Sequence, residues 1–222
     1  MKNLFLLVIT IVLCTACARR EFLPPAGTAR TVEVGLLLRK QFTTDIREKR
    51  HYRHVHAVLA DGTVVSFNPA RDGIPTISRL LFRHPGRVQT PSDMREIRKH
   101  YVSAAVARDC EYKGKPHHKI VTDWVKFRVT PEQALKLSAA WERLGENPPS
   151  FRLFGLNCAT RAYDCLREAG ILPGNIPGID RPENIMKPLR RYYPDLTVET
   201  GYFGLDAAGK PYLEPLDLAN AQ

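Results

Sequence analysis

The sequence predicts an α+β domain in which an antiparallel sheet packs against helices, and three patterns carry this prediction. Apolar residues alternate with polar ones over 120–129, which is typical of a half-buried strand. The pair Asp61-Gly62 separates two β-rich runs, which is typical of a hairpin of antiparallel strands. Capping residues in front of apolar repeats spaced three and four apart predict helices between these strands.

In the first half of the chain we expect a strand over 31–38 and the two hairpin strands over 52–60 and 63–68. Residues 70–91 are rich in Pro, Gly and Arg and predict a loop with a short strand near 76–82. Ser92 can cap a helix that runs to about residue 108.

The second half begins with the strand over 120–129. Thr130-Pro131-Glu132-Gln133 combines an N-cap, a proline at the first helical position and a capping-box glutamine. The helix that follows is expected to end at Gly145 and to bury four residues: Leu135, Leu137, Trp141 and Leu144. A further helix is expected over 159–169, closed by Gly170, and a short one near 183–191.

The amino terminus has the pattern of an export signal. Lys2 precedes ten residues, 4–13, that carry no charge, and this run is too short for the roughly 20 apolar residues that span a bilayer. The segment ends Leu13-Cys14-Thr15-Ala16-Cys17, which resembles a bacterial lipobox with Cys17 as the lipidated residue. Ordinary secretion with cleavage near Ala16 or Ala18 is the alternative.

These patterns divide the chain into a signal peptide over 1–17, a tether over 18–31 and a single domain over 32–222. We therefore expect an exported protein on the periplasmic face of the outer membrane, held there by a lipid anchor. The chain carries a net charge of +10, which favours anionic surroundings such as lipid head groups or cell-wall polymers. Basic residues are scattered and no nucleic-acid motif is present, so we expect no nucleic-acid partner.

Three cysteines lie beyond the signal region: Cys110, Cys158 and Cys165. An odd number in an oxidising compartment is compatible with one disulfide and one free thiol, or with three free thiols. Cys110 and Cys165 are the candidate pair for a disulfide. The His and Cys residues lack the spacing of a zinc site, so we expect no metal and no other cofactor.

Cys158 is the candidate nucleophile. Asn157 is a good N-cap, which places Cys158 in the first turn of the next helix. The helix dipole and the free backbone N–H groups there would lower the pKa of the thiol from about 8.5. The same N–H groups could hold the oxyanion that forms when a thiolate attacks a carbonyl. The alternative is that Cys158 is a small buried apolar residue, as free cysteines often are.

The candidate base lies in the hairpin. His54 and His56 are two residues apart and therefore share one face of a strand. A three-residue loop centred on Asp61 would place Asn68 opposite His54, and Ser66 opposite His56. A histidine oriented by an Asn or Ser is the second half of a cysteine-hydrolase site. A two-residue turn would shift the register and lose this pairing.

Residues 54–65 resemble the strand-turn-strand of NlpC-type and lecithin-retinol-acyltransferase-like proteins, and Phe154-Gly155-Leu156-Asn157-Cys158 resembles their Asn-Cys motif at a helix start. The order, with His first and Cys about a hundred residues later, is that of the circularly permuted papain-like branch. The resemblance covers residues 50–70 and 150–172. It implies a papain-like, circularly permuted NlpC-type fold.

Carried over by position, the general base of the family falls on His54 and the nucleophile on Cys158. The third polar residue, twelve residues after the base, falls on Ser66, where the family usually has His, Asn, Gln or Glu. Asn68 is the alternative for that role because of the cross-strand register. His56 stands where the family has a small residue, and it becomes the base if the alignment is shifted by two.

These features together predict a cell-envelope cysteine hydrolase, an amidase or peptidase, or an acyltransferase. The expected substrates are peptidoglycan peptides, with lipid amides or esters as the second choice. The alternative is a non-catalytic envelope lipoprotein of the same fold that binds cell wall or lipid. The unusual Ser66 and the additional His56 favour this alternative.

Overall fold

Eight strands form one sheet in the order β10-β9-β7-β1-β2-β3-β4-β8, and every neighbouring pair is antiparallel. The computed structural model describes residues 30–40, 52–71, 74–89, 111–112, 115–116, 121–174, 176, 179–205 and 210–215. The strands are β1 (Val32–Lys40), β2 (Tyr52–Val58), β3 (Val64–Pro69), β4 (His84–Gln89), β7 (Val121–Val129), β8 (Ser150–Phe151), β9 (Thr197–Leu205) and β10 (Pro211–Glu214). A separate pair joins β5 (Glu111–Tyr112) to β6 (Lys115–Pro116).

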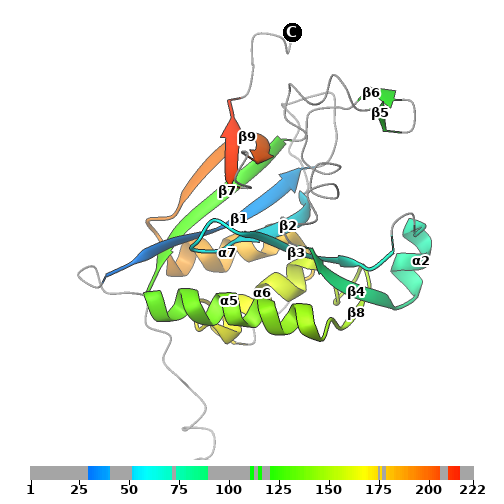
Figure 1. Cartoon of the computed structure of the whole chain (residues 1–222), viewed down its shortest axis with the longest axis horizontal. Helices are drawn as coiled ribbons and strands as arrows, with labels where there is room; N and C mark the ends of the chain where they lie inside the picture. Colours follow the sequence, from blue (N-terminus) through cyan, green and yellow to red (C-terminus); the bar gives the residue numbers. More distant parts are fainter. Residues whose placement is uncertain are drawn as a thin grey trace, which may run out of the picture.

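Three helices lie together on one side of this sheet: α5 (Pro131–Glu146), α6 (Cys158–Glu168) and α7 (Pro182–Tyr192) (Figure 1). A shorter helix, α2 (Thr76–Leu81), stands apart from them at the β4 end of the molecule. The arrangement confirms the predicted α+β class with a large antiparallel sheet. No helix among the described residues is both long and apolar enough to span a membrane.

The sheet separates two apolar clusters. The larger cluster joins alternate residues of the central strands, such as Leu36, Val55 and Phe67, to the buried faces of α5, α6 and α7. The smaller cluster lies on the other face of the sheet and contains Leu37 and Phe203 among others. Because successive residues of a strand point to opposite faces, the central strands β1, β2, β3 and β7 contribute to both clusters.

The hairpin has a three-residue loop, which is one of the two turn lengths that the sequence leaves open. Leu59 N–H donates to the carbonyl of Thr63 at 2.8 Å, which leaves three residues between them, centred on Asp61. Gly62 closes the turn with a φ of +87°, a conformation that glycine adopts without a Cβ clash. The pairs Ala57–Val65 and Val58–Val64 have the register expected from this loop.

The region over 121–146 also follows the sequence prediction. Strand β7 has the expected bounds to within one residue, and the Thr130 hydroxyl accepts from Gln133 N–H while the Gln133 side chain accepts from Thr130 N–H, as in a capping box. One prediction is wrong: Leu135 is 72% exposed rather than buried. It lies on the outer side of α5, away from Leu137 and Trp141, which face the core.

Two other predictions are wrong or incomplete. Residues 76–81 form α2 rather than a short strand, and Pro75 stands at the N-cap of this helix. The neighbouring strand is β4, just after the predicted segment. Strands β9 and β10 were not predicted at all, and they extend the sheet beyond β7.

Several sequence-based predictions lie outside the described residues. These are the signal peptide over 1–17 with Cys17, nearly all of the tether over 18–31, the helix over 92–108 and Cys110.

Candidate active site

Asn157 and Cys158 begin helix α6 as the sequence predicts. The side-chain Oδ1 of Asn157 accepts from Ala159 N–H at 2.9 Å and from Thr160 N–H at 3.1 Å. Cys158 is the first residue of the helix and is 7% exposed. The cap therefore uses two of the N–H groups that were expected to be free for an oxyanion, and the N–H of Cys158 itself is the better candidate for that role.

The side-chain amide nitrogen of Asn157 makes a second set of contacts. It donates to the carbonyl of Leu153 at 2.6 Å and to the carbonyl of Asp180 at 2.7 Å. Asp180 lies just before α7, whose N-cap is Arg181. One buried asparagine thus holds the first turn of α6, the loop before it and the segment that leads into α7.

The pKa expected for Cys158 is wrong in direction. Burial raises the pKa of this thiol to about 11, because the surrounding core disfavours the charged thiolate. Backbone N–H groups of Val55 and Ala159 and the charge of Arg39 act in the opposite direction, but more weakly. At neutral pH the residue is a thiol, so an attack on a carbonyl would need a base to remove its proton.

The candidate base His54 contacts Ser66 rather than the residue expected opposite it. His54 Nε2 lies 3.0 Å from Ser66 Oγ, and Asn68 Nδ2 donates to the same Oγ at 2.6 Å. Asn68 also donates to the side chain of Gln89, which is buried in β4. His54, Ser66, Asn68 and Gln89 therefore form one polar chain across β2, β3 and β4, with Ser66 between the histidine and the asparagine.

His56 is almost fully buried, at 1% exposure, and its ring meets that of His54 edge-on with 4.5 Å between the centroids. Across β1 it pairs with Leu37, which belongs to the smaller cluster. His56 thus lies on the face of the sheet opposite to the three helices. This position makes it a neighbour of His54 rather than a second base beside Cys158.

His54 and Cys158 both line a pocket at the place where the hairpin opens. Strand alternation puts His54 on the same face as His56, whereas Val55 and Cys158 belong to the helix-side cluster. The β2–β3 ladder, however, contains only the two pairs next to the turn. Beyond them the Val55 N–H points to the sulfur of Cys158 instead of to β3, and the gap between the strands joins the two faces.

A pocket of about 370 Å³ occupies this opening, and its walls include Cys158, His54, Asn68 and Asn157. Its other lining residues are Arg39, Tyr52, Pro69, Arg79, Phe151, Leu153, Phe154, Asp180, Arg181, Pro182 and Glu183. The pocket therefore combines the candidate nucleophile, the candidate base and charges of both signs. Four of the sequence-predicted site residues line one cavity; Ser66 contacts two of them, His54 and Asn68, and His56 contacts His54.

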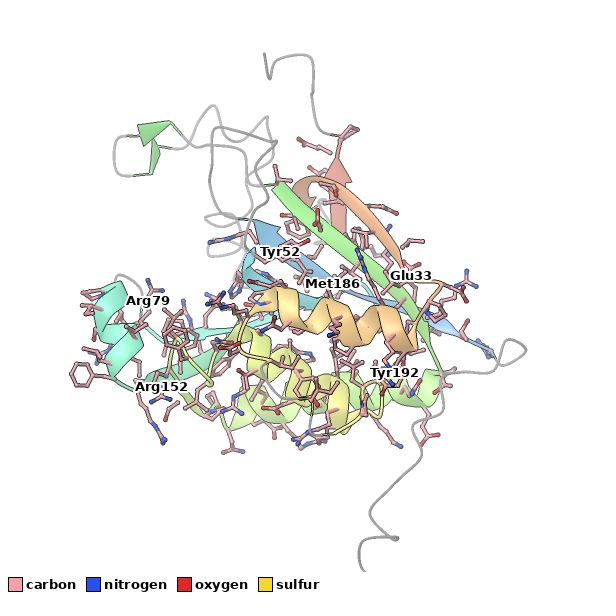
Figure 2. All side chains as sticks on the ribbon, turned by 180° about the vertical axis from the view of Figure 1, so that it is seen from behind. Glu33, Tyr52, Arg79, Arg152, Met186 and Tyr192 are labelled. Carbon is pink, nitrogen blue, oxygen red and sulfur yellow. The ribbon has the colours of Figure 1, made fainter. Side chains whose placement is uncertain are left out.

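A second polar cluster beside the pocket has no signature in the sequence. Tyr52 donates its phenol hydrogen to the carboxylate of Asp123, which also accepts from Thr200 at 2.7 Å. Burial and this carboxylate raise the pKa of Tyr52 well above its usual range. Figure 2 shows Tyr52 near one end of α7 and Tyr192 near the other. A bulge in β2 turns Tyr52 to the helix side, and such an irregularity has no signature in the sequence.

The remaining thiol of the described residues, Cys165, is buried on the core side of α6, and burial raises its pKa to about 12. It is unbonded, as is Cys158. Within the described part of the chain, no group of three or more His, Cys, Asp or Glu side chains is arranged to hold a metal ion.

Comparison with known proteins adds no relative. No family model matches the chain, and neither a curated protein nor a solved structure is significantly similar to it.

Proposed function

We propose that the protein is a cysteine hydrolase or acyltransferase in which Cys158 is the nucleophile and His54 the general base. The observation that carries the proposal is the shared pocket: the first residue of an N-capped helix and a strand histidine line one cavity where the hairpin ladder ends. A nucleophile, a base and a third group that orients the base are the parts that such chemistry needs. Ser66, backed by Asn68, is the orienting group.

The reaction follows from the protonation states. His54 removes the proton from the buried Cys158 thiol as the sulfur attacks an amide or ester carbonyl. The sulfur then holds the acyl group as a thioester, and the imidazolium returns the proton to the departing amine or alcohol. Water completes a hydrolysis, and another nucleophile completes a transfer. The high pKa of the thiol makes the base indispensable, unlike in a preformed thiolate–imidazolium pair.

The papain-like, circularly permuted NlpC-type arrangement remains part of this proposal. An antiparallel sheet whose histidine strand precedes a helix beginning with Asn-Cys supports it. The export pattern of residues 1–17 and the lipobox-like Cys17 support a place at the periplasmic face of the outer membrane. Peptidoglycan peptides are the proposed substrates, with lipid amides or esters as the second class.

The second candidate function is a non-catalytic envelope lipoprotein of this fold that binds cell wall or lipid. Two observations favour it. Cys158 is buried with a pKa of about 11, and regular strand alternation turns the His54 side chain to the face opposite the helices. In this case the polar chain from His54 to Gln89 holds the open end of the hairpin together.

One experiment distinguishes the enzyme from the non-catalytic lipoprotein. The full chain, its Cys158→Ser variant and a Cys165→Ser control are incubated with purified peptidoglycan and, separately, with phospholipid vesicles, and products are read by mass spectrometry. The enzyme releases products with either substrate, loses them on Cys158→Ser and keeps them on Cys165→Ser. Binding of either material without any product favours the non-catalytic function.

A further inference from the structure

The end of the molecule that carries α2 exposes an unusual group of apolar side chains. Ile77, Leu81 and Phe82 are 63%, 59% and 62% exposed, and Phe154 beside them is 46% exposed. Ile77 and Leu81 are four residues apart and lie on the same face of the helix. We call these four residues the α2 patch. Grouped exposed apolar residues on a soluble domain mark an interaction surface more often than scattered ones do.

The patch adjoins the pocket of Cys158. Leu153 N–H donates to the carbonyl of Arg79 at 2.8 Å, which ties the loop of Phe154 to α2. Arg79, Leu153 and Phe154 all line the pocket. Whatever the α2 patch contacts therefore lies close to the pocket entrance.

The charged residues of the two segments that carry the patch have one sign, although Asp180 and Glu183 line the adjoining pocket. Residues 74–89 and 150–157 contain Arg79, Arg83, Arg87 and Arg152 and no Asp or Glu. Arg83 is exposed beside Phe82, and Figure 2 shows Arg79 and Arg152 at this end of the molecule. Exposed apolar side chains beside the exposed Arg83 and the partly exposed Arg152 match the interface of an anionic bilayer, where the apolar groups enter the acyl boundary and the guanidinium groups meet phosphates.

We propose that the α2 patch is a membrane-docking surface that binds bilayers containing anionic phospholipid and sets the pocket entrance against the lipid surface. The docking surface does not depend on the chemistry of Cys158, and it acts in either of the two candidate functions. A protein partner would be expected to offer carboxylates to the same arginines, whereas a bilayer supplies both the apolar layer and the anionic charge.

Depth-dependent quenching of tryptophan fluorescence tests this surface in the full chain. In Phe82→Trp, the added indole reports whether residue 82 enters vesicles that contain brominated phosphatidylcholine and phosphatidylglycerol. Leu135→Trp is the matched control, since Leu135 is 72% exposed on α5 and lies outside the patch. The unsubstituted chain gives the background from Trp124 and Trp141.

Docking through the patch predicts that the Phe82→Trp emission is quenched and that the Leu135→Trp emission is not, even if another segment also holds the chain on the vesicle. Adding Arg83→Glu, or about 1 M NaCl, where the Debye length is about 3 Å, weakens the quenching. Equal quenching at residues 82 and 135, or none at residue 82, would overturn the proposal. Quenching that is unchanged in vesicles without phosphatidylglycerol would overturn the role of the arginines.

Discussion

Cys158 combines a position that favours ionisation with surroundings that oppose it. The N-terminus of α6 and the N–H groups of Val55 and Ala159 stabilise a negative sulfur, and Arg39 adds to this. Burial in the apolar cluster has the larger effect, so the thiol keeps its proton. Cys158 can therefore act as a nucleophile only if a base removes the proton of its thiol.

Titration of the native protein checks this balance. The ultraviolet absorbance of thiolate, taken as the difference between the wild type and Cys158→Ser, is expected to be absent at pH 7–9 and to develop near pH 11. Since the unfolded thiol ionises near pH 9, the free energy of unfolding of the wild type should also fall, relative to Cys158→Ser, as the pH rises from 9 towards 11. A thiolate signal already present at pH 7 would contradict the account.

Sequence reasoning located Cys158 and Asn157 correctly because capping is a local property of a few consecutive residues. It erred on the pKa because burial depends on what packs against the sulfur, and Val55 lies more than a hundred residues away. The observed hairpin register is one of the two that the sequence left open, and the sequence could not show that the ladder ends after two pairs. Ser66 therefore contacts His54, where the register alone would favour Asn68.

At the level of elements, α6 is held by its cap more firmly than α5. Thr130 makes a capping box at the start of α5, whereas Asn157 both caps α6 and donates to two carbonyl groups outside it. One of these bonds connects the start of α6 to Leu153 in the loop before it, and the other connects it to Asp180 in the segment before α7. Asn157 therefore holds the first turn of α6, with Cys158, through the cap bonds inside the helix and through one bond to each of two neighbouring segments.

The pair Asn157→Ala and Thr130→Ala measures this difference. Loss of the α5 cap should lower the free energy of unfolding by about 1 kcal/mol. Asn157→Ala should cost about 2–4 kcal/mol, because the cap is lost and two buried carbonyls lose their donor. Urea denaturation measures both values, and a cost for Asn157→Ala no larger than that of Thr130→Ala would show that the two outer bonds contribute nothing.

The elements that sequence reasoning missed are those whose formation depends on distant partners. The segment of β9 contains two glycines and gains its strand partners from β7 and β10. Helix α2 has only six residues, too few for a periodic pattern to outweigh its β-branched residues. The hairpin and the capping box were predictable because Asp61-Gly62 and Thr130 to Gln133 carry their structural signal within a few residues.

For the whole molecule, the sheet is continuous from β10 to β8, and Gly86 in β4 permits the last part of it. A Cβ at this position would collide with the ring of Phe67 in β3 and with the carbonyl of Pro149, just before β8. Phe67 also meets Phe151 with 5.9 Å between the ring centroids. The absence of a side chain at Gly86 therefore lets β3, β4 and β8 close the pocket end of the core.

Gly86→Ala should destabilise the protein by about 1–3 kcal/mol, the usual cost of overpacking a core. Gly174→Ala is the control, since the nearest atom to its new Cβ would be Arg167 Cδ at 3.8 Å, an ordinary contact. Thermal unfolding followed by circular dichroism compares the two. An unchanged melting temperature for Gly86→Ala would mean that β4 is not packed against Phe67 as described.

The most direct test of the Cys158–His54 site is the pH dependence of acylation by p-nitrophenyl acetate, with the acetyl group mapped to its residue by mass spectrometry. With His54 as the base, Cys158 is acetylated already at pH 7, where the thiol by itself keeps its proton. In His54→Ala the rate is far lower at pH 7 and rises about tenfold per pH unit towards the thiol pKa of about 11. Identical pH profiles for the wild type and His54→Ala, or no acetyl group on Cys158, would contradict the account.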